Sequence, residues 1–135
     1  MILLDTSVLI DYLRDTENAA TRTLDSIIDN ELPYGICDFV YQELLQGTRT
    51  EKEFRELKEY LETLPFYYLK YGKESFEKAA LLNFTCRRAG LTIRSTIDLL
   101  IAETAIENDL YLLHNDADFD NMAQKIHSLK IYRTE

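Results

Sequence analysis

Short, wholly apolar runs separated by longer helical segments are the feature that most constrains how this chain can fold. The runs cover residues 2–4, 32–37, 66–69, 110–113 and, as a possible last strand, 129–132. Strands that are apolar throughout, instead of alternately apolar and polar, are typical of parallel sheets buried on both faces. We therefore predict an α/β fold with a central parallel sheet of four to five short strands, flanked by helices on both faces.

Apolar residues recur at helical spacing between these runs. The expected helices cover residues 8–13, 18–30, 39–46, 50–63, 74–89, 95–108 and 118–126. Gly47 and Gly90 close two of these helices, and Pro65 ends a third. With 135 residues, 46% of them hydrophobic, the chain is long enough for one core and too short for two ordinary domains. Residues 1–135 are therefore expected to form a single domain.

The net charge limits which partners the chain can bind. Twenty-four acidic residues against 15 basic ones give a net charge of −9, which repels polyanions over most of the surface. One segment, residues 70–94, is locally cationic, with six Lys or Arg residues and two Glu residues. Function must therefore come from a defined site, and the cationic segment is either a solvated helix face or a binding surface.

Neither a membrane span nor a disulfide framework is expected. The longest apolar runs are far shorter than the 18 or more residues that a membrane helix needs. The N-terminal run has no basic region before it and meets Asp5 too early for a signal peptide, so we expect a cytoplasmic protein. Cys37 and Cys86 lie far apart without a C-x-x-C spacing, which favours two reduced structural thiols over a disulfide or a zinc site.

Five carboxylates share positions near which a predicted strand ends or a helix begins: Asp5, Glu43, Asp98, Asp116 and Asp118. In parallel sheets covered by helices, sites form where the carboxyl ends of strands meet the amino ends of helices. Each acid alone has a simpler explanation, because Asp98 could form a capping box with Ser95 and Asp118 could cap the last helix. Only their combination indicates a site.

The residues next to the acids place them beside the core. Asp98 is followed by the apolar residues 99–102, and Glu43 by Leu44 and Leu45. Charges in such places are costly unless they are paired or bind cations, and Arg94 is the only close cation in the sequence. A divalent cation is the natural neutraliser. Oxygen ligands without Cys or suitably spaced His suit Mg²⁺ or Mn²⁺, ions that activate water to hydrolyse phosphodiesters.

Four segments resemble the successive motifs of PIN domains, and most closely those of VapC ribonuclease toxins. They are LLDTSVLID at residues 3–11, ELLQG at 43–47, DLLIA at 98–102 and HNDADF at 114–119. Their order and spacing cover nearly the whole chain. No single motif is specific, but the four together in a chain of this size are a strong signal.

The resemblance implies the roles of individual residues. The catalytic, metal-binding acids would be Asp5, Glu43, Asp98 and Asp116. Asp118 would be a fifth acid near a second metal position and could exchange roles with Asp116. Thr6 would form a hydrogen bond within the site.

The resemblance also implies an activity and partners. The chain would be an endoribonuclease that depends on Mg²⁺ or Mn²⁺ and hydrolyses phosphodiester bonds in structured RNA. A VapB-like antitoxin would hold it inactive, and the toxin would form a homodimer. The candidate RNA-binding residues are then Arg87, Arg88 and Arg94 of the cationic segment.

Two other classes of function stay open. A phosphoaspartyl or receiver-like enzyme would use Asp5 as its nucleophile, but the haloacid-dehalogenase pattern wants Asp-x-Asp there, and Asp5-Thr6-Ser7 lacks it. A PIN-fold module that only binds RNA or protein would have lost site acids, and none is lost.

Four polar residues near the motifs are set aside. Asp11 and Asp120 are expected to point away from the site into solvent. His114 and His127 are expected to be ordinary surface or packing residues, because a bound metal would already supply the hydroxide that a general base provides.

Overall fold

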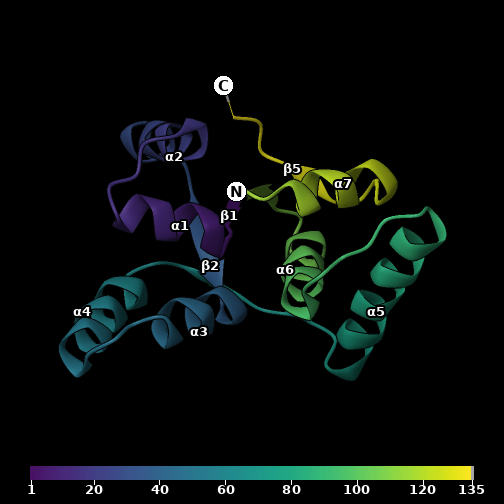
Figure 1. The fold of residues 1–135 in the computed structure, drawn as a ribbon, viewed down its shortest axis with the longest axis horizontal. Coiled ribbons are helices and arrows are strands. Elements are labelled where there is room, and N and C mark those ends of the chain that lie inside the picture. The colour runs from purple at the N-terminus through teal and green to yellow at the C-terminus, as the bar shows by residue number, and fades with distance from the viewer. Residues whose placement is uncertain (135) are drawn as a thin grey trace.

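A five-stranded, wholly parallel sheet forms the centre of the molecule in the computed structural model, which describes residues 1–134 (Figure 1). The strands are β1 (Ile2–Leu4), β2 (Tyr34–Cys37), β3 (Phe66–Tyr67), β4 (Tyr111–Leu113) and β5 (Lys130–Ile131). Their order across the sheet is β3-β2-β1-β4-β5. Strands β2 and β3 therefore lie on one side of β1, and β4 and β5 lie on its other side, so the strand order reverses between β1 and β4. The predicted α/β fold is confirmed.

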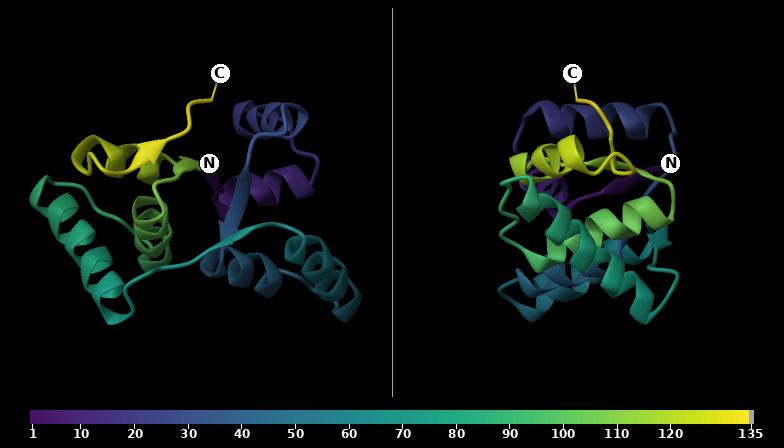
Figure 2. Two further views of the ribbon diagram at one scale, coloured as in Figure 1. Left: turned by 180° about the vertical axis from the view of Figure 1, so that it is seen from behind. Right: turned by 90° about the vertical axis from the view of Figure 1, so that its right-hand side faces the viewer.

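Helices cover both faces of this sheet, as expected. They are α1 (Thr6–Leu13), α2 (Ala19–Asp29), α3 (Asp38–Gln46), α4 (Glu51–Glu62), α5 (Lys73–Arg88), α6 (Thr96–Glu107) and α7 (Ala117–Lys125). Helices α1 to α4 lie on one side and α5 to α7 on the other, and the view from behind shows the same division (Figures 1 and 2). The two groups meet where α3 contacts α6.

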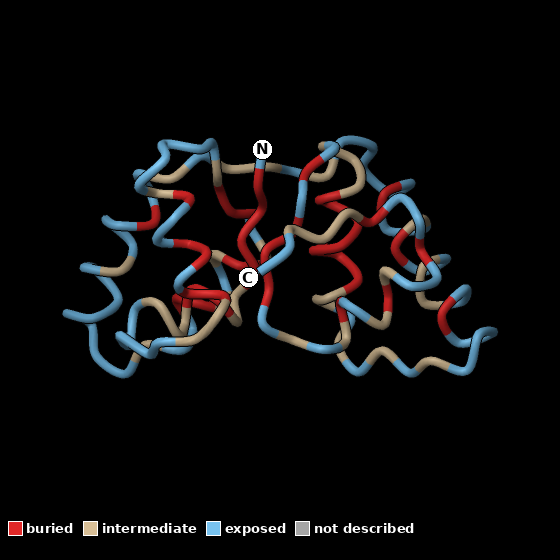
Figure 3. The backbone as a smooth tube through the Cα atoms, turned by 90° about the horizontal axis from the view of Figure 1, so that it is seen from above, coloured by how far each residue is buried: buried red, intermediate tan, exposed pale blue. Residues whose placement is uncertain are grey.

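The apolar strands form the core because both of their faces are covered. All three residues of β1 are buried, and Leu112 and Leu113 of β4 have no exposed surface. Figure 3 shows the buried segments along the middle of the molecule and the exposed ones on the outer helices. Full burial of one such leucine contributes about 1.5–3 kcal/mol relative to leaving it in water. This core fixes the ends of the strands, from which the candidate site residues project.

The elements differ from the predicted ones mainly at their ends. Strand β2 begins at Tyr34 instead of residue 32, because the backbone N–H of Leu32 donates to the carbonyl of Ile27 and closes helix α2. Helix α1 begins at Thr6 instead of residue 8, because Asp5 caps it. Strand β3 stops at Tyr67, two residues earlier than predicted.

Two expectations about the chain as a whole can be compared with the structure. Cys37 and Cys86 are buried free thiols, and burial raises the pKa of Cys37 to about 12, so they are structural as predicted. Within residues 1–134, none of the helices combines the length and the apolar character that crossing a lipid bilayer requires.

Candidate metal centre

The reversal point of the sheet brings together acids that lie far apart in the sequence. Asp5 directly follows β1, and Asp116 lies three residues beyond the end of the neighbouring strand β4. The backbone N–H of Asp5 donates to the carbonyl of Leu113 at 3.0 Å, which ties the two strand ends to each other. Crevices at such reversal points are where parallel α/β sheets usually hold their ligands.

Asp5 is the most deeply buried of the five acids. Its side chain is 4% exposed, and its Oδ2 accepts from the backbone N–H of Ser7 at 3.0 Å and from the Ser7 hydroxyl at 2.5 Å. Burial raises the pKa of Asp5, and the hydrogen bonds from Ser7 oppose that rise. Capping of α1 therefore explains the position of Asp5, but it leaves a desolvated carboxylate at the edge of the crevice.

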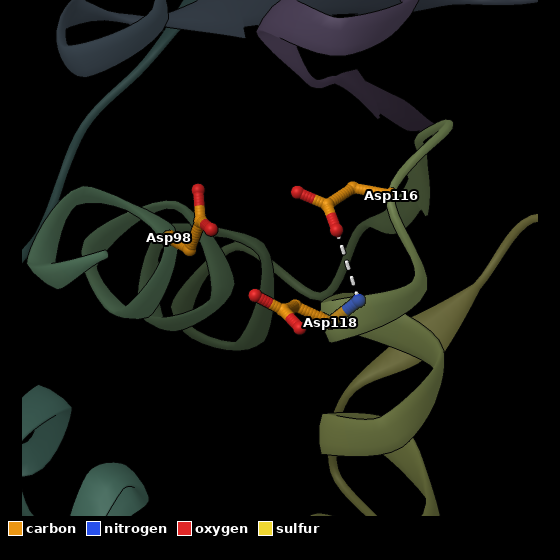
Figure 4. A group of neighbouring side chains, drawn as sticks. All are labelled: Asp98, Asp116 and Asp118. Atoms are coloured by element: carbon orange, nitrogen blue, oxygen red, sulfur yellow. Dashed lines mark hydrogen bonds between the residues drawn. The ribbon is translucent and has the colours of Figure 1, made fainter. Parts of the chain in front are cut away.

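Three aspartates come within metal-ligand distance of one another. Asp98, Asp116 and Asp118 each offer a carboxylate oxygen, and these three oxygens lie within 4.8 Å of each other. Figure 4 shows the carboxylates of Asp98, from the first turn of α6, and of Asp116 and Asp118, from the start of α7, gathered around one space. The arrangement suits one hard cation held between the two helix ends.

The charges of the other four acids act on Asp98. Its pKa is raised to about 7, first by burial and then by the negative charges of Asp5, Asp116, Glu43 and Asp118. Glu43 projects from α3, where the Thr6 hydroxyl donates to its Oε1 at 2.8 Å. Thr6 therefore makes the kind of hydrogen bond that was expected of it. The structure brings the five acids to one place, with Asp5 and Glu43 beside the closer group of three.

Helix capping explains the positions of some of these acids but not of others. Asp116 is the N-cap of α7, since its Oδ1 accepts from the backbone N–H of Asp118 at 2.9 Å. The cap is therefore Asp116 and not Asp118. Ser95 is the N-cap of α6 but makes no side-chain capping hydrogen bond, so Asp98 belongs to no capping box with it. Capping leaves Asp98, Asp118 and Glu43 unexplained.

The donor set fits a hard divalent cation. Every candidate ligand is a carboxylate, and within residues 1–134 none of the five acids forms an ion pair with a Lys or Arg side chain. Like charges at such distances repel strongly in a partly desolvated site. A Mg²⁺ or Mn²⁺ ion would supply the missing positive charge to the oxygen ligands that it prefers.

Sequence reasoning missed the residues that hold the acids in place. The Ser7 hydroxyl accepts from the backbone N–H of Asn115 at 2.9 Å while donating to Asp5. His114 is 8% exposed and packs against Phe119, as a packing residue would. Its Nδ1 also accepts from the backbone N–H of Asp116 at 3.0 Å, which places the ring proton on Nε2. Their only sequence signal was adjacency to the motif acids.

The expectation that both of the aspartates set aside are solvated holds for Asp120 and is wrong for Asp11. Asp11 is half-buried, and its Oδ2 accepts from the side-chain amides of Asn18 and Asn115. Asp120 has a largely exposed side chain, but its Oδ1 lies 3.1 Å from Nε2 of His114. Both carboxylates therefore bind neighbouring side chains next to the site.

The candidate RNA-binding arginines lie outside the acidic group. Arg87 and Arg88 are exposed in the last turn of α5, and Arg94 is exposed in the linker that leads from α5 into α6. The guanidinium of Arg88 lies over the ring of Phe84, 5.7 Å from its centroid. Within residues 1–134, none of the three arginines forms an ion pair with one of the five acids.

The family model described as "PIN domain" matches residues 2–125. Ribonuclease VapC11 of Mycobacterium tuberculosis is 33% identical over 125 residues, which cover 92% of each chain. The structure of VapBC2 from Rickettsia felis bound to a promoter DNA fragment covers all of both chains at 20% identity, with a TM-score of 0.74. A toxin-antitoxin complex from Klebsiella pneumoniae covers 88% of this chain and 90% of its own at 20% identity, with a TM-score of 0.66.

Metal binding should depend on the ionisation of Asp98. Because its pKa is raised to about 7, Asp98 is mostly protonated at about pH 6, and Mn²⁺ must displace that proton. The affinity for Mn²⁺, measured by isothermal titration calorimetry, should therefore be about tenfold lower at about pH 6 than at about pH 8. Asp98→Asn should bind Mn²⁺ weakly and lose most of this dependence. Equal affinities of the unaltered chain at both pH values would contradict the assignment.

Proposed function

Since the chain belongs to the PIN domain family, with VapC ribonucleases among its relatives, we propose that it is an endoribonuclease that hydrolyses phosphodiester bonds in structured RNA with Mg²⁺ or Mn²⁺. The observation that carries the proposal is the gathering of five carboxylates with which no Lys or Arg side chain of residues 1–134 forms an ion pair. Such a group is expensive for a fold to maintain unless a cation binds there.

The ion would be held by Asp98, Asp116 and Asp118, with Asp5 and Glu43 beside them. When bound, the ion lowers the pKa of a water molecule that it coordinates and stabilises negative charge on a phosphate. The chain itself fixes the ligands: Ser7 holds Oδ2 of Asp5, and Thr6 holds Oε1 of Glu43. Ligands fixed in this way need little rearrangement when a substrate phosphate arrives.

The alternatives have weaker support. A nucleophilic Asp5 would need a reachable carboxylate oxygen, but Asp5 is 4% exposed and Ser7 occupies its Oδ2 with two hydrogen bonds. A module that only binds RNA or protein would not need to retain all five acids in one place. Catalysis by a bound metal accounts for both observations.

The substrate would be held beside the site, because the acids themselves repel a phosphate backbone. Arg87 and Arg88 are exposed at the end of α5, and Arg94 lies in the linker before Asp98. These arginines belong to residues 70–94, the cationic segment of an otherwise acidic chain. They would bind the RNA backbone while the carboxylates hold the metal.

A VapB-like antitoxin would inhibit the nuclease by binding next to Glu43. A groove of about 870 Å³ lies between α1, α3 and α4, and its lining combines apolar residues with two arginines and with Glu43, Glu53 and Glu56. The lining includes Ile10, Leu13, Leu44, Leu57, Tyr60, Arg14 and Arg49. Leu13 is 42% exposed there, and an apolar segment of the antitoxin would cover it. One structural neighbour is itself a toxin-antitoxin complex.

The nuclease proposal predicts RNA cleavage that requires metal and Asp5. The purified chain should cleave structured RNA with Mn²⁺ or Mg²⁺, and EDTA should abolish the cleavage. Asp5→Asn should lower the rate at least about 100-fold, more than the loss of an outer-shell partner usually does. Its fold should survive, because burial already disfavours the charge of Asp5. Asp25→Asn, an exposed change on α2, is the matched control. Metal-independent cleavage, or full activity of Asp5→Asn, would refute the proposal.

Charge reversal at the end of α5 tests the RNA-binding surface. In the inactive Asp5→Asn background, combining Arg87→Glu with Arg88→Glu should weaken RNA binding and reduce the slope of log affinity against log salt by about 2. The control combines Lys52→Glu with Arg55→Glu on exposed α4, which Figure 1 shows at the opposite end of the molecule. Fluorescence anisotropy at several salt concentrations measures both. If the two double variants bind RNA alike, α5 is not the binding surface.

A charged side chain introduced into the groove tests whether the antitoxin binds there. Leu13→Glu should abolish co-purification with a co-expressed VapB-like antitoxin, since a carboxylate would be buried in an apolar contact. Its metal-dependent cleavage of RNA should remain. Leu32→Glu, at a similarly exposed leucine before β2, should leave the complex intact. A complex that survives Leu13→Glu would place the antitoxin elsewhere.

A further inference from the structure

The pair of Asp11 and Asn115 connects two segments that carry site acids. We propose that Asp11 and Asn115 are positioning residues, which hold the loop before Asp116 against helix α1 and thereby set the spacing between Asp116 and Asp5. The inference rests on the proposed function, because it assigns these residues to the metal centre of that nuclease. Neither residue is among the carboxylates that would ligate the ion.

Asp11 acts as a shared acceptor for two side-chain amides. Its Oδ2 accepts from Nδ2 of Asn115 at 3.1 Å and from Nδ2 of Asn18 at 2.9 Å. Asn18 is the N-cap of α2, and its own Oδ1 accepts from the backbone N–H of Thr21. One carboxylate oxygen of α1 therefore binds both the start of α2 and the loop that follows β4.

Asn115 is fixed to α1 at two points. Its side chain donates to Asp11, and its backbone N–H donates at 2.9 Å to the hydroxyl of Ser7. That hydroxyl in turn donates to Oδ2 of Asp5. Asn115 is covalently bonded to Asp116, so a chain of hydrogen bonds and one peptide linkage joins the acid after β1 to the acid after β4.

The physical need for this connection follows from the charges. Asp116 and Asp5 both raise the pKa of Asp98 by repulsion, so before metal binds, the acids push the loop and α1 apart. The hydrogen bonds of Asn115 to Ser7 and Asp11 oppose that displacement. Partners that orient metal ligands in this way typically contribute about 10- to 100-fold to metal affinity.

Two variants of Asp11 separate the hydrogen bonds from the charge. Asp11→Ala removes the acceptor, whereas Asp11→Asn keeps an oxygen that can accept from both amides and removes the charge. By electron paramagnetic resonance of free Mn²⁺, Asp11→Ala should raise the dissociation constant for Mn²⁺ about tenfold, and Asp11→Asn should stay within about twofold of the unaltered chain. Asp25→Ala, at an exposed position of α2, is the control. All measurements are made well below each variant's unfolding temperature.

Coupling between the two residues gives a second readout that a loss of stability alone would not produce. Asp11→Ala and Asn115→Ala remove the same hydrogen bond, so the double variant should bind Mn²⁺ about as weakly as the weaker single variant. An unchanged dissociation constant for Asp11→Ala, equal weakening by Asp11→Ala and Asp11→Asn, or additive effects would each overturn the inference.

The inference and the proposed function fail in different ways. If the unaltered chain binds Mn²⁺ and cleaves RNA while Asp11→Ala does both equally well, only the positioning role is lost. If the unaltered chain neither binds Mn²⁺ nor cleaves RNA, the proposed function itself is wrong, and the positioning role falls with it.

Discussion

Repulsion among carboxylates at one edge of the sheet is the constraint on which the architecture around the site depends. Asp5 and Asp116 follow adjacent parallel strands because the strand order reverses between β1 and β4. Contact between α3 and α6 brings Glu43 and Asp98 to the same edge. The apolar strands pull these segments together, and the charges oppose their approach. A fold keeps such a conflict where function requires it.

Neutral hydrogen-bond donors, and not cations, hold the acids. Ser7 binds Asp5, Thr6 binds Glu43, and the backbone N–H of Asp118 binds Asp116. Hydroxyl and amide donors orient a carboxylate without cancelling its charge, whereas a lysine or arginine would compete with a metal for the same oxygens. Three of the five acids are therefore oriented while the site keeps its negative charge, which is the combination that a divalent cation needs.

The sequence was sufficient for the fold class and for the five acids, because both follow from local patterns. Apolar runs predict buried strands, and an acid directly after such a run predicts a residue at the sheet edge. The supporting contacts could not be predicted in this way. Asp11 binds Asn115, 104 residues away, and the sequence gives no register between α1 and the loop after β4. The cap of α7 was also placed two residues too late, since it is Asp116 and not Asp118 that caps the helix.

A raised pKa does not by itself identify a metal centre, as a second acidic pair in the molecule shows. Glu103 is 3% exposed, and its pKa is raised to about 8 by burial and by its hydrogen bond and repulsion with Glu107. Only two negative charges meet there, and Oε1 of Glu107 accepts from the backbone N–H of Lys70 and from the Ser75 hydroxyl. At Asp98, four other acids act together, and one proton cannot neutralise them. The number of converging negative charges, and not the pKa shift of any single group, indicates a site for a divalent cation.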